Sequence, residues 1–446
     1  MNASGLKKIL ILSYFFPPCV LTAAQRSHGW ARYLHRFGYY PIIITRNWER
    51  LIASPDDMHH DSGSQVIHQQ HDGYEVWYVP FKGNRRDRLY ARYGKTKYNT
   101  LRKALSYWEL LAHHFITAVI PFKHIYYFAD QYLKTHSDVS AMIVTGNPFE
   151  IFRFGYLLHS RHHIPWIADY RDDWTTSEVY QKRGLADSLL RWLERKSERR
   201  YISTAHCITS VSPYYAEKIG RFVKRPGHSI LNGFVKSDFV PYNNLPLAPQ
   251  FTIVYNGMLY PSQNIKVFLD AFKQLADQFA EHQQQLRLKF PGILFLKDVA
   301  KYVREQLKGY EHLLEMTERI PRQEVLNIQA SAHLLLMVAH TGSKGIPSSK
   351  IYEYLALGKP VLICPGDDDI LDQTFQPYNL GYIANTPAEA FEVLQKLFEQ
   401  FLQGESALNR PDTAYSAQFS REIQVEKLAG LLDEMSLSTG NLSTSG

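Results

Sequence analysis

The sequence predicts an α/β protein made of two doubly wound domains, each with a parallel sheet. Short apolar runs alternate with longer amphipathic stretches along almost the whole chain, which is typical of parallel strands covered on both faces by helices. The alternation pauses once, at a segment rich in proline and asparagine, and then resumes. The chain has 446 residues, 45% of them hydrophobic, which is enough for two or three domains with large cores.

Six strands are expected in the first domain. The run KILILS at residues 8–13 and the run IIIT at residues 42–45 flank a helical stretch that ends near Gly38. The remaining apolar runs are at residues 141–145, 166–169, 207–211 and 229–231. Because helical stretches separate these runs, they are expected to form one parallel sheet buried on both faces.

The pause in the pattern predicts a domain boundary. Residues 236–250 contain three prolines and two asparagines and are expected to link a first domain, 1–235, to a second, 251–410. The strands expected in the second domain are at residues 251–255, 286–290, 333–338, 360–364 and 381–383. Residues 411–446 are expected to form a C-terminal helix, which could pack on the first domain, and a polar tail. Ligands of such sheets bind at the carboxyl ends of strands, so the expected site lies between the domains.

The formal net charge of +7 favours an acidic partner such as a phosphate, a nucleic acid or an anionic membrane. Residues 81–127 concentrate basic and aromatic side chains in one stretch. That stretch suits docking to an anionic bilayer, and it equally suits helices packed on the first domain with a solvated basic face. A nucleic-acid partner is not expected, because the sequence has no recognised binding motif and its basic residues are spread among acidic ones.

The cysteines and the N-terminus bear on the compartment. Cys19, Cys207 and Cys364 lie far apart, which favours reduced thiols in a reducing compartment. The apolar stretch behind the first eight residues is too short for a convincing secretory signal. No run approaches the roughly 18 apolar residues that span a bilayer. We therefore expect a cytoplasmic protein, either soluble or peripheral on the inner face of the cell membrane.

The window GSKGIPSSKIYEYLALGKPVLIC at residues 342–364 carries the strongest indication of a ligand site. It predicts a helix that Ser348 or Ser349 can cap and that Gly358 and Pro360 end. Because the first N–H groups of a helix have no partner within it, they favour a bound anion.

Two charged residues of that helix sharpen the expectation. Lys350, in its first turn, adds a positive charge that suits a diphosphate. Glu353 lies in an apolar helix that is expected to be buried, so its carboxylate needs donors, and ribose hydroxyls would supply two. The alternative is that an arginine or a backbone N–H satisfies Glu353 and that the loop before the helix is only a turn.

A second charged window, IPWIADYRDDWT, occupies residues 164–175. Its predicted strand runs into four charged residues: Asp169, Arg171, Asp172 and Asp173. Charges concentrated beside aromatic residues at the carboxyl end of a strand suit catalysis or sugar binding. The alternative is a set of ion pairs such as Arg171 with Asp169, which explains part of the cluster and leaves a surplus of carboxylates.

Other positions are less specific. The connection after the first strand has no GxGxxG motif, so the usual mode of dinucleotide binding is not supported. Arg26, beyond that connection, could point into the site or cap a surface turn. Gly257 permits a close approach of the backbone to a ligand, or only a turn. No recognised metal-binding arrangement is formed by the histidines His59, His60, His68 and His71.

Taken together, motifs along nearly the whole chain resemble glycosyltransferase family 4, whose GT-B fold has two facing Rossmann-like domains. The motifs are KKILILSYFFPP at the start, TGNPFE at 145–150, IPWIADYRDDW, ITSVS at 208–212, ILNGF at 230–234, YNGMLY at 255–260 and SSKIYEYLALGKPVL. The sequence looks most like the branch that assembles bacterial surface polysaccharides. The resemblance implies retaining transfer from a nucleotide-diphosphate sugar to a glycan or lipid-linked acceptor, with no metal or other cofactor required.

The resemblance also implies roles for single residues. Glu353 matches the second glutamate of the family's Glu-x7-Glu motif, which binds the donor ribose. The donor-binding group then comprises Glu353, Lys350, Ser349, Ser348 and Gly257, and the acceptor side comprises Arg26 and Asn147. The pair Arg171–Asp172 stands where the family often has His–Asp. Asp172 or Asp169 would orient or deprotonate the acceptor hydroxyl, and Arg171 could hold a phosphate or a carboxylate.

Three departures from the family pattern leave a second function open. Gly345 stands where the first glutamate of the motif is expected, and Met258 and Gln263 lie near the positions of the usual arginine and lysine. Lys350 could replace part of the missing charge. The alternative function is a transferase-like protein that binds a nucleotide sugar or a glycan with little or no turnover.

Overall fold

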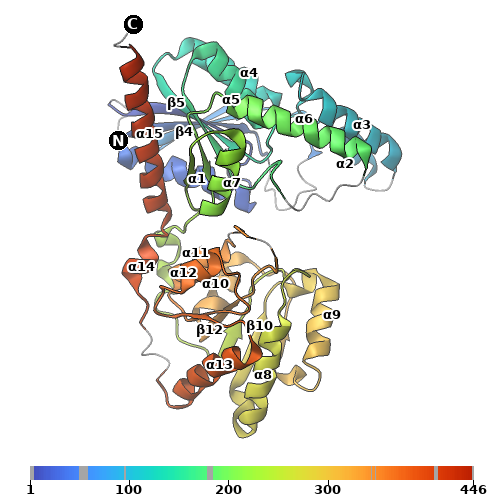
Figure 1. Ribbon diagram of the computed structural model, residues 1–446, viewed down its shortest axis with the longest axis vertical. Coiled ribbons are helices and arrows are strands. Elements are labelled where there is room, and N and C mark those ends of the chain that lie inside the picture. Colours follow the sequence, from blue (N-terminus) through green and yellow to red (C-terminus); the bar gives the residue numbers. More distant parts are fainter. Residues whose placement is uncertain are drawn as a thin grey trace. The chain divides into compact units, whose positions relative to one another are not determined.

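In the computed structural model the chain forms two compact units, which are described one at a time (Figure 1). The first unit comprises residues 1–232 and 424–446, and the second comprises residues 233–423. The structure describes residues 5–49, 59–94, 97–177, 184–342, 344–346, 348–405 and 410–443, without the side chains of 185–186 and 438–443. Residues 236–250, the expected linker, belong to the second unit and contain two short 3-10 helices, η4 (Lys236–Asp238) and η5 (Val240–Tyr242).

The first unit is built on an eight-stranded sheet with the order β3-β4-β2-β1-β5-β6-β7-β8. Its strands are β1 (Lys7–Ser13), β2 (Tyr39–Arg46), β3 (Ile67–His71), β4 (Tyr74–Val79), β5 (Val139–Gly146), β6 (Trp166–Tyr170), β7 (Cys207–Ser210) and β8 (Gly227–Ser229). All pairings are parallel except that of β3 with β4. The six expected strands are present, and the edge hairpin β3–β4 is an addition that the sequence pattern did not predict.

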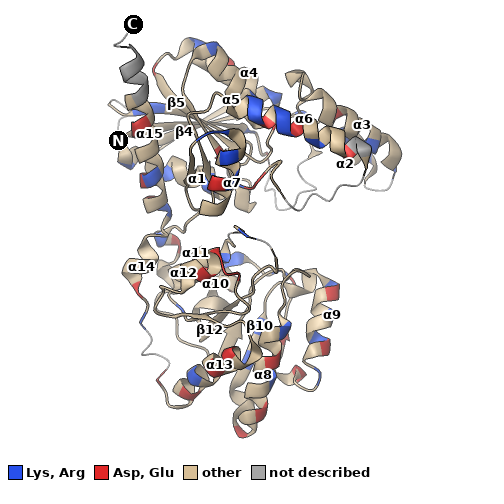
Figure 2. Cartoon of the chain, viewed as in Figure 1, with Lys and Arg blue, Asp and Glu red and all other residues tan. Residues whose placement is uncertain are grey.

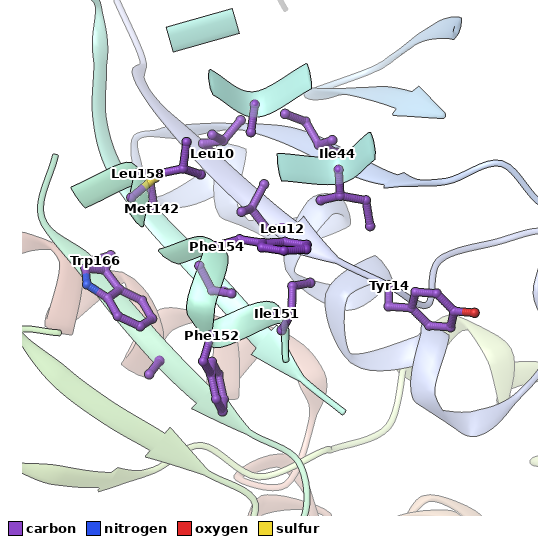
Figure 3. Packing of buried hydrophobic residues seen from close by; sticks show 14 of the residues in the cluster. Leu10, Leu12, Tyr14, Ile44, Met142, Ile151, Phe152, Phe154, Leu158 and Trp166 are labelled. Carbon is purple, nitrogen blue, oxygen red and sulfur yellow. The ribbon is translucent and has the colours of Figure 1, made fainter. Parts of the chain in front are cut away.

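Helices cover the first sheet and supply its core. They are α1 (Thr22–Tyr33), the short η1 (Leu34–Phe37), α2 (Arg85–Tyr93), α3 (Asn99–Ala112), η3 (Thr117–Val119), α4 (Lys123–Thr135), α5 (Ile151–His162), α6 (Leu185–Ile202) and α7 (Pro213–Val223). Side chains of β1, such as Leu10 and Leu12, pack with Phe152 and Phe154 of α5 in a fully buried cluster (Figure 3). The basic and aromatic stretch at 81–127 forms α2, α3, η3 and the start of α4.

The second unit contains a six-stranded parallel sheet with the order β11-β10-β9-β12-β13-β14. Its strands are β9 (Phe251–Val254), β10 (Leu286–Phe290), β11 (Leu314–Met316), β12 (Leu334–Met337), β13 (Val361–Ile363) and β14 (Gly381–Ile383). The five expected strands are present, together with the short β11. The chain moves outward from β9 and then returns to β12 on the other side of β9, which is the doubly wound order with its switch point between these two strands.

The α-helices of the second unit surround this sheet. They are α8 (Lys266–Gln278), α9 (Lys297–Gln306), α10 (Arg322–Ala330), α11 (Lys350–Leu357), α12 (Ile370–Phe375), α13 (Pro387–Leu402) and α14 (Thr413–Ala417); the 3-10 turns η6 (Ala280–Gln285), η7 (Ile293–Phe295) and η8 (Glu311–Leu313) lie between them. The predicted fold class, two doubly wound parallel-sheet domains, is therefore confirmed. None of the described helices is both long and apolar enough to cross a lipid bilayer.

The last helix, α15 (Arg421–Ser443), belongs to the first unit from Gln424 onward. There the Tyr39 hydroxyl donates a hydrogen bond to Asp433 (2.6 Å), and the Leu231 N–H donates to the side chain of Gln424 (2.9 Å). Leu428 and Leu432 are fully buried. The chain thus returns at its end to complete the first unit.

Candidate functional site

The strongest candidate site in the second unit lies where α11 begins, after β12. Ser349 is the N-cap residue of α11, but its side chain makes no capping hydrogen bond. The Lys350 N–H donates a hydrogen bond to the Ser348 hydroxyl (3.4 Å), and the Ile351 N–H donates to the Ser348 carbonyl (3.2 Å). At the other end, Gly358 has φ +63° and ends the helix, as predicted. The first two N–H groups of α11 therefore have their acceptors in Ser348, which is one of the two serines predicted to cap this helix.

Lys350 is a cation held in an apolar setting. Its ammonium lies 3.9 Å from the centre of the Tyr255 ring, and its Cε lies 3.8 Å from the point that a Cβ on Gly257 would occupy. Burial lowers the pKa of Lys350 to about 7, although the charge of Glu353 acts in the opposite direction. Among the described residues, no carboxylate lies within ion-pair distance of this ammonium. A desolvated cation without an ion pair is a candidate for binding an anionic ligand.

Gly257 forms the backbone wall beside Lys350. Its φ is +84°, and its N–H donates to the Pro291 carbonyl (2.8 Å). Gly292, which has φ +89°, packs against it: a Cβ on Gly292 would lie 3.4 Å from the Cα of Gly257. Gly257 therefore forms a tight turn, and the close approach of a ligand to its backbone stays a prediction.

Glu353 departs from the expectation of a buried acid. Its side chain is 23% exposed, and Oε1 accepts a hydrogen bond from the guanidinium of Arg322 at 3.0 Å. The alternative that an arginine satisfies this acid thus holds for one of its two oxygens. Because Arg322 is itself 52% exposed, the pair is a solvated one that contributes about 0–1 kcal/mol and can exchange partners.

Gln263 and Met258, near the positions where the family has its lysine and arginine, make other contacts. The side chain of Gln263 donates to the Val338 carbonyl and accepts from the Tyr260 N–H (2.9 Å), so it joins the loop after β9 to the end of β12. The guanidinium of Arg319 lies 3.6 Å from the Met258 sulfur, so a cation from another part of the chain is present at this position. Arg319 was missed in the sequence because it follows β11, a strand of only three residues.

Gly345, where the family has its first glutamate, contacts a carboxylate from a different loop. The residue is buried with φ +73°, and its N–H donates to Asp369. Asp369 lies at the start of α12, after β13. A carboxylate is thus present beside this position, although the sequence places none at residue 345.

In the first unit, Asp169 and Arg26 form a buried ion pair at the carboxyl end of β6. Their side chains are 0% and 3% exposed and approach to 2.6 Å. Asp169 also accepts hydrogen bonds from Thr145 (2.8 Å) and Thr209 (2.7 Å), and Arg26 donates to the Ile230 carbonyl (2.7 Å). The direct roles predicted for Asp169 and Arg26 do not fit this placement, because neither side chain reaches the surface. Their positions are those of a structural pair that ties α1 to three strands of the sheet.

Arg171 and Asp172 remain at the surface after the same strand. Their side chains are 26% and 56% exposed and form an ion pair at 3.1 Å. The N–H of Arg171 donates to the carbonyl of the residue before Asn147 (3.3 Å), which places the exposed Asn147 beside them. Asp173 is instead paired with Lys218 (3.4 Å). The exposed members of the predicted first-domain group are therefore Asn147, Arg171 and Asp172.

Metal ligands are not assembled in the part of the chain that the structure describes. No group of three or more His, Cys, Asp or Glu side chains in that part has an arrangement that could hold a metal ion. The His68 ring stacks on Trp77 (4.0 Å) and that of His71 stacks on Tyr74 (4.6 Å), so these histidines pack against aromatic residues.

Comparison with known proteins bears on this site. Residues 243–415 match the family described as glycosyl transferases group 1, a range that includes Gly257, Lys350 and Glu353. No curated protein sequence is similar enough to count as a relative. The second unit therefore carries a glycosyltransferase group 1 domain, and the protein is a glycosyltransferase.

Solved structures support the fold over the whole chain. The trehalose 6-phosphate synthase of Burkholderia multivorans has a TM-score of 0.59 at 10% identity, with 99% of each chain covered. The sucrose-phosphate synthase of Thermosynechococcus elongatus has a TM-score of 0.55 at 14% identity, with 97% of this chain and 100% of that one covered. The Anabaena protein Alr3699/HepE, in complex with UDP and glucose, has a TM-score of 0.54 at 14% identity, with 96% and 100% covered. At these identities the likeness shows the GT-B fold alone.

Proposed function

We propose that this glycosyltransferase transfers a sugar, with retention of configuration, from a nucleotide-diphosphate donor to a glycan or lipid-linked acceptor in the assembly of a cell-surface polysaccharide. The observation that carries the proposal is Lys350, a desolvated cation without an ion pair among the described residues, at the start of α11 and next to Gly257. The family-4 motifs that the sequence resembles support the retaining reaction and the polysaccharide role.

On the donor side, the diphosphate is the leaving group and gathers negative charge as the glycosidic bond breaks. Lys350, at the start of α11, stabilises that charge. Glu353 accepts hydrogen bonds from the ribose hydroxyls through the oxygen that Arg322 does not occupy. Arg319, which reaches Met258, supplies the second cation at the place where the family has its arginine.

On the acceptor side, the exposed Asp172 orients the attacking hydroxyl and accepts its proton. Its partner Arg171 fixes the position of the carboxylate through the ion pair at 3.1 Å. Asp169 acts through the sheet rather than on the acceptor, as the buried partner of Arg26. No step requires a metal ion or another cofactor.

The donor can be identified by nucleotide release. The similar Anabaena protein holds UDP and glucose, so UDP-sugars are the first donors to test, followed by GDP- and ADP-sugars. We expect one donor to give nucleoside diphosphate and a glycosylated product. We also expect Glu353→Gln to weaken binding of that donor about tenfold, because an amide replaces the acceptor of two charge-assisted hydrogen bonds. An unchanged donor affinity in this variant would remove Glu353 from the ribose site.

The alternative function, binding without turnover, is favoured by the absence of a glutamate at Gly345 and of cations at Met258 and Gln263. The same donor panel separates the two functions. Saturable binding of a nucleotide sugar without release of nucleoside diphosphate, across all donors and acceptors, would establish a binding protein.

Attachment to an anionic membrane is part of the proposed function. The helices α3 and α6 expose large apolar side chains, among them Leu101, Trp108, Leu189 and Trp192, each about half exposed. Lys and Arg residues lie along the same helices (Figure 2). Exposed aromatic residues settle at a bilayer interface, and each nearby cation adds about 1 kcal/mol at an anionic surface. A lipid-linked acceptor would be presented at that surface.

Vesicle sedimentation tests this attachment. We expect the protein to sediment with vesicles that contain phosphatidylglycerol and to remain in solution with vesicles of phosphatidylcholine alone. The double variant Trp108→Ser/Trp192→Ser should lose most of the binding, whereas Tyr302→Ser, at an exposed aromatic residue of the second unit, should keep it. Equal sedimentation of both variants would show that α3 and α6 do not form the membrane contact.

A further inference from the structure

A cavity of about 720 Å³ lies within the first unit, beside the edge hairpin β3–β4 and apart from the residues assigned above. Its floor is aromatic and buried: Phe16, Trp48, Tyr74 and Tyr78 line it, and each is less than 9% exposed. The Tyr78 hydroxyl donates to the carbonyl of Pro17 (2.9 Å), which fixes the connection after β1 over the hairpin. The cavity is thus formed by the connection after β1 and by the edge hairpin β3–β4.

The rim of the cavity is polar but almost uncharged. It includes the side chains of Gln65, Gln69 and His71, and Glu49 is the one carboxylate among the described lining residues. No lysine or arginine is among the described residues that line it. The described lining residues offer a phosphate or diphosphate no counter-charge, and their amide and imidazole groups suit a neutral ligand rich in hydroxyl groups.

Two glutamines of the rim, Gln65 and Gln69, have exposed side chains. An amide group both donates and accepts hydrogen bonds, so it can bind hydroxyl groups in either direction. The rim therefore favours a ligand with several oxygen atoms over a purely apolar one.

The wall of the cavity is linked to the acceptor-side residues. The Trp48 ring stacks on Phe15 with centroids 5.8 Å apart, and the guanidinium of Arg171 lies 6.0 Å from the same Phe15 ring. Phe15 thus stands between the cavity and the Arg171–Asp172 pair. The cavity wall and the Arg171–Asp172 pair are thus both neighbours of this ring, which places the cavity near the acceptor-side residues.

We propose that this cavity binds a neutral sugar residue of the acceptor glycan, adjacent to the residue that receives the transferred sugar. The inference rests on the proposed function, which supplies the acceptor. Aromatic rings pack against the apolar faces of a pyranose, while the amide and imidazole groups of the rim bind its hydroxyls. The volume lies within the range of about 300–1,000 Å³ that is usual for small-molecule sites.

The register of β3 gives a matched pair of variants. Successive side chains of a strand point to opposite faces, so Ile67, Gln69 and His71 line the cavity, whereas His68 lies on the other face and stacks on Trp77. Gln69→Trp places a large ring into the cavity from an exposed position. His68→Trp adds a ring to the same strand on the opposite face and keeps an aromatic partner for Trp77.

The test measures binding of methyl glycosides of glucose, galactose, mannose, rhamnose and N-acetylglucosamine to the full chain by saturation-transfer NMR. We expect at least one to bind, Gln69→Trp to weaken that binding about tenfold or more, and His68→Trp to leave it within about twofold. If Gln69→Trp does not fold, as judged by circular dichroism, His71→Ala takes its place with the same expectation. Binding of none of the glycosides, or equal binding by wild type and the cavity variant, overturns the inference.

The same samples separate this inference from the proposed function. Binding of the glycosides needs no nucleotide, and donor binding at Lys350 needs no occupied cavity. Sugar binding that fails while a nucleotide sugar still binds overturns the inference alone. A nucleotide sugar that fails to bind while glycosides still bind overturns the proposed function alone.

Discussion

The two sheets have the same central strand order, but the charged residues near the carboxyl ends of their strands differ in whether they have an ion-pair partner. In the first unit, Arg26 and Asp169 are both buried and bind each other. In the second, Lys350 lies over the Tyr255 ring and has no ion-pair partner within the described residues. A buried charge with a partner stabilises the framework, whereas one without a partner raises the free energy of the unliganded protein and leaves binding energy for an anion. Burial alone therefore does not mark a functional residue, and the partner must also be found.

The largest effect is expected when the buried ion pair between Arg26 and Asp169 is broken. Arg26→Ala leaves Asp169 buried without its cation, and the free energy of unfolding should fall by about 3–5 kcal/mol. Urea unfolding followed by circular dichroism measures this change. Arg171→Ala is the control, because it removes an exposed ion pair and should cost about 1 kcal/mol or less. Similar losses for both variants would contradict the structural role of Arg26.

The second prediction concerns the exposed acid beside that edge. Asp172→Asn should lower kcat about 100-fold or more, because the acceptor hydroxyl loses its general base, while donor affinity stays within about twofold. Initial rates at saturating donor give the result. A variant that weakened donor binding and left kcat unchanged would move Asp172 out of the acceptor group.

The third prediction tests Lys350, which has no ion-pair partner among the described residues. Lys350→Met should weaken binding of a nucleoside diphosphate about 10- to 100-fold, since a charge-assisted contact is worth about 1.5–3 kcal/mol. Unlike Arg26→Ala, it should not lower stability, because the removed cation is desolvated and has no partner to abandon. Calorimetric titration and thermal unfolding measure the two effects, with the exposed Lys308→Met as the control. A destabilised Lys350→Met variant would make Lys350 a structural residue.

The smallest effect is a pH dependence. The pKa of Lys350 is lowered to about 7 by burial, and a bound diphosphate would raise it again, so binding should take up one proton above pH 7. Donor affinity should be level below pH 7 and fall by up to about tenfold per pH unit above it. The nearby His340 should stay neutral throughout, because burial and Lys350 lower its pKa. Lys350→Met should abolish the slope; an unchanged slope in this variant would assign it to another group.

Most of the fold could be predicted because the central strands are continuous apolar runs. The runs at 8–13 and 141–145 appear as β1 and β5 because strands buried on both faces have that composition. The edge strand β3, IHQQH, is mostly polar and all five of its residues are exposed, so it has no apolar pattern to detect. β11, LEM, has a glutamate between its two apolar residues and none of the three is buried, so it does not form an apolar run.

The candidate site could be predicted only where its signals are local in sequence. Lys350, Ser349 and Gly358 are recognisable because a helix start and a helix end each depend on a few neighbouring residues. The pairing of Arg26 with Asp169 joins residues 143 positions apart, and that of Arg322 with Glu353 joins residues 31 positions apart. No local pattern encodes such contacts, so the sequence could name these charges but could not say which of them neutralise each other.

The return of α15 to the first unit has a consequence for biosynthesis. Buried side chains of this helix, including Leu428 and Leu432, belong to a core whose other strands are made first. The first unit therefore emerges from the ribosome with part of its hydrophobic surface uncovered until the buried residues of α15 have been translated. A chain that stops after residue 423 would lack these buried side chains, although it would contain every described strand of both sheets.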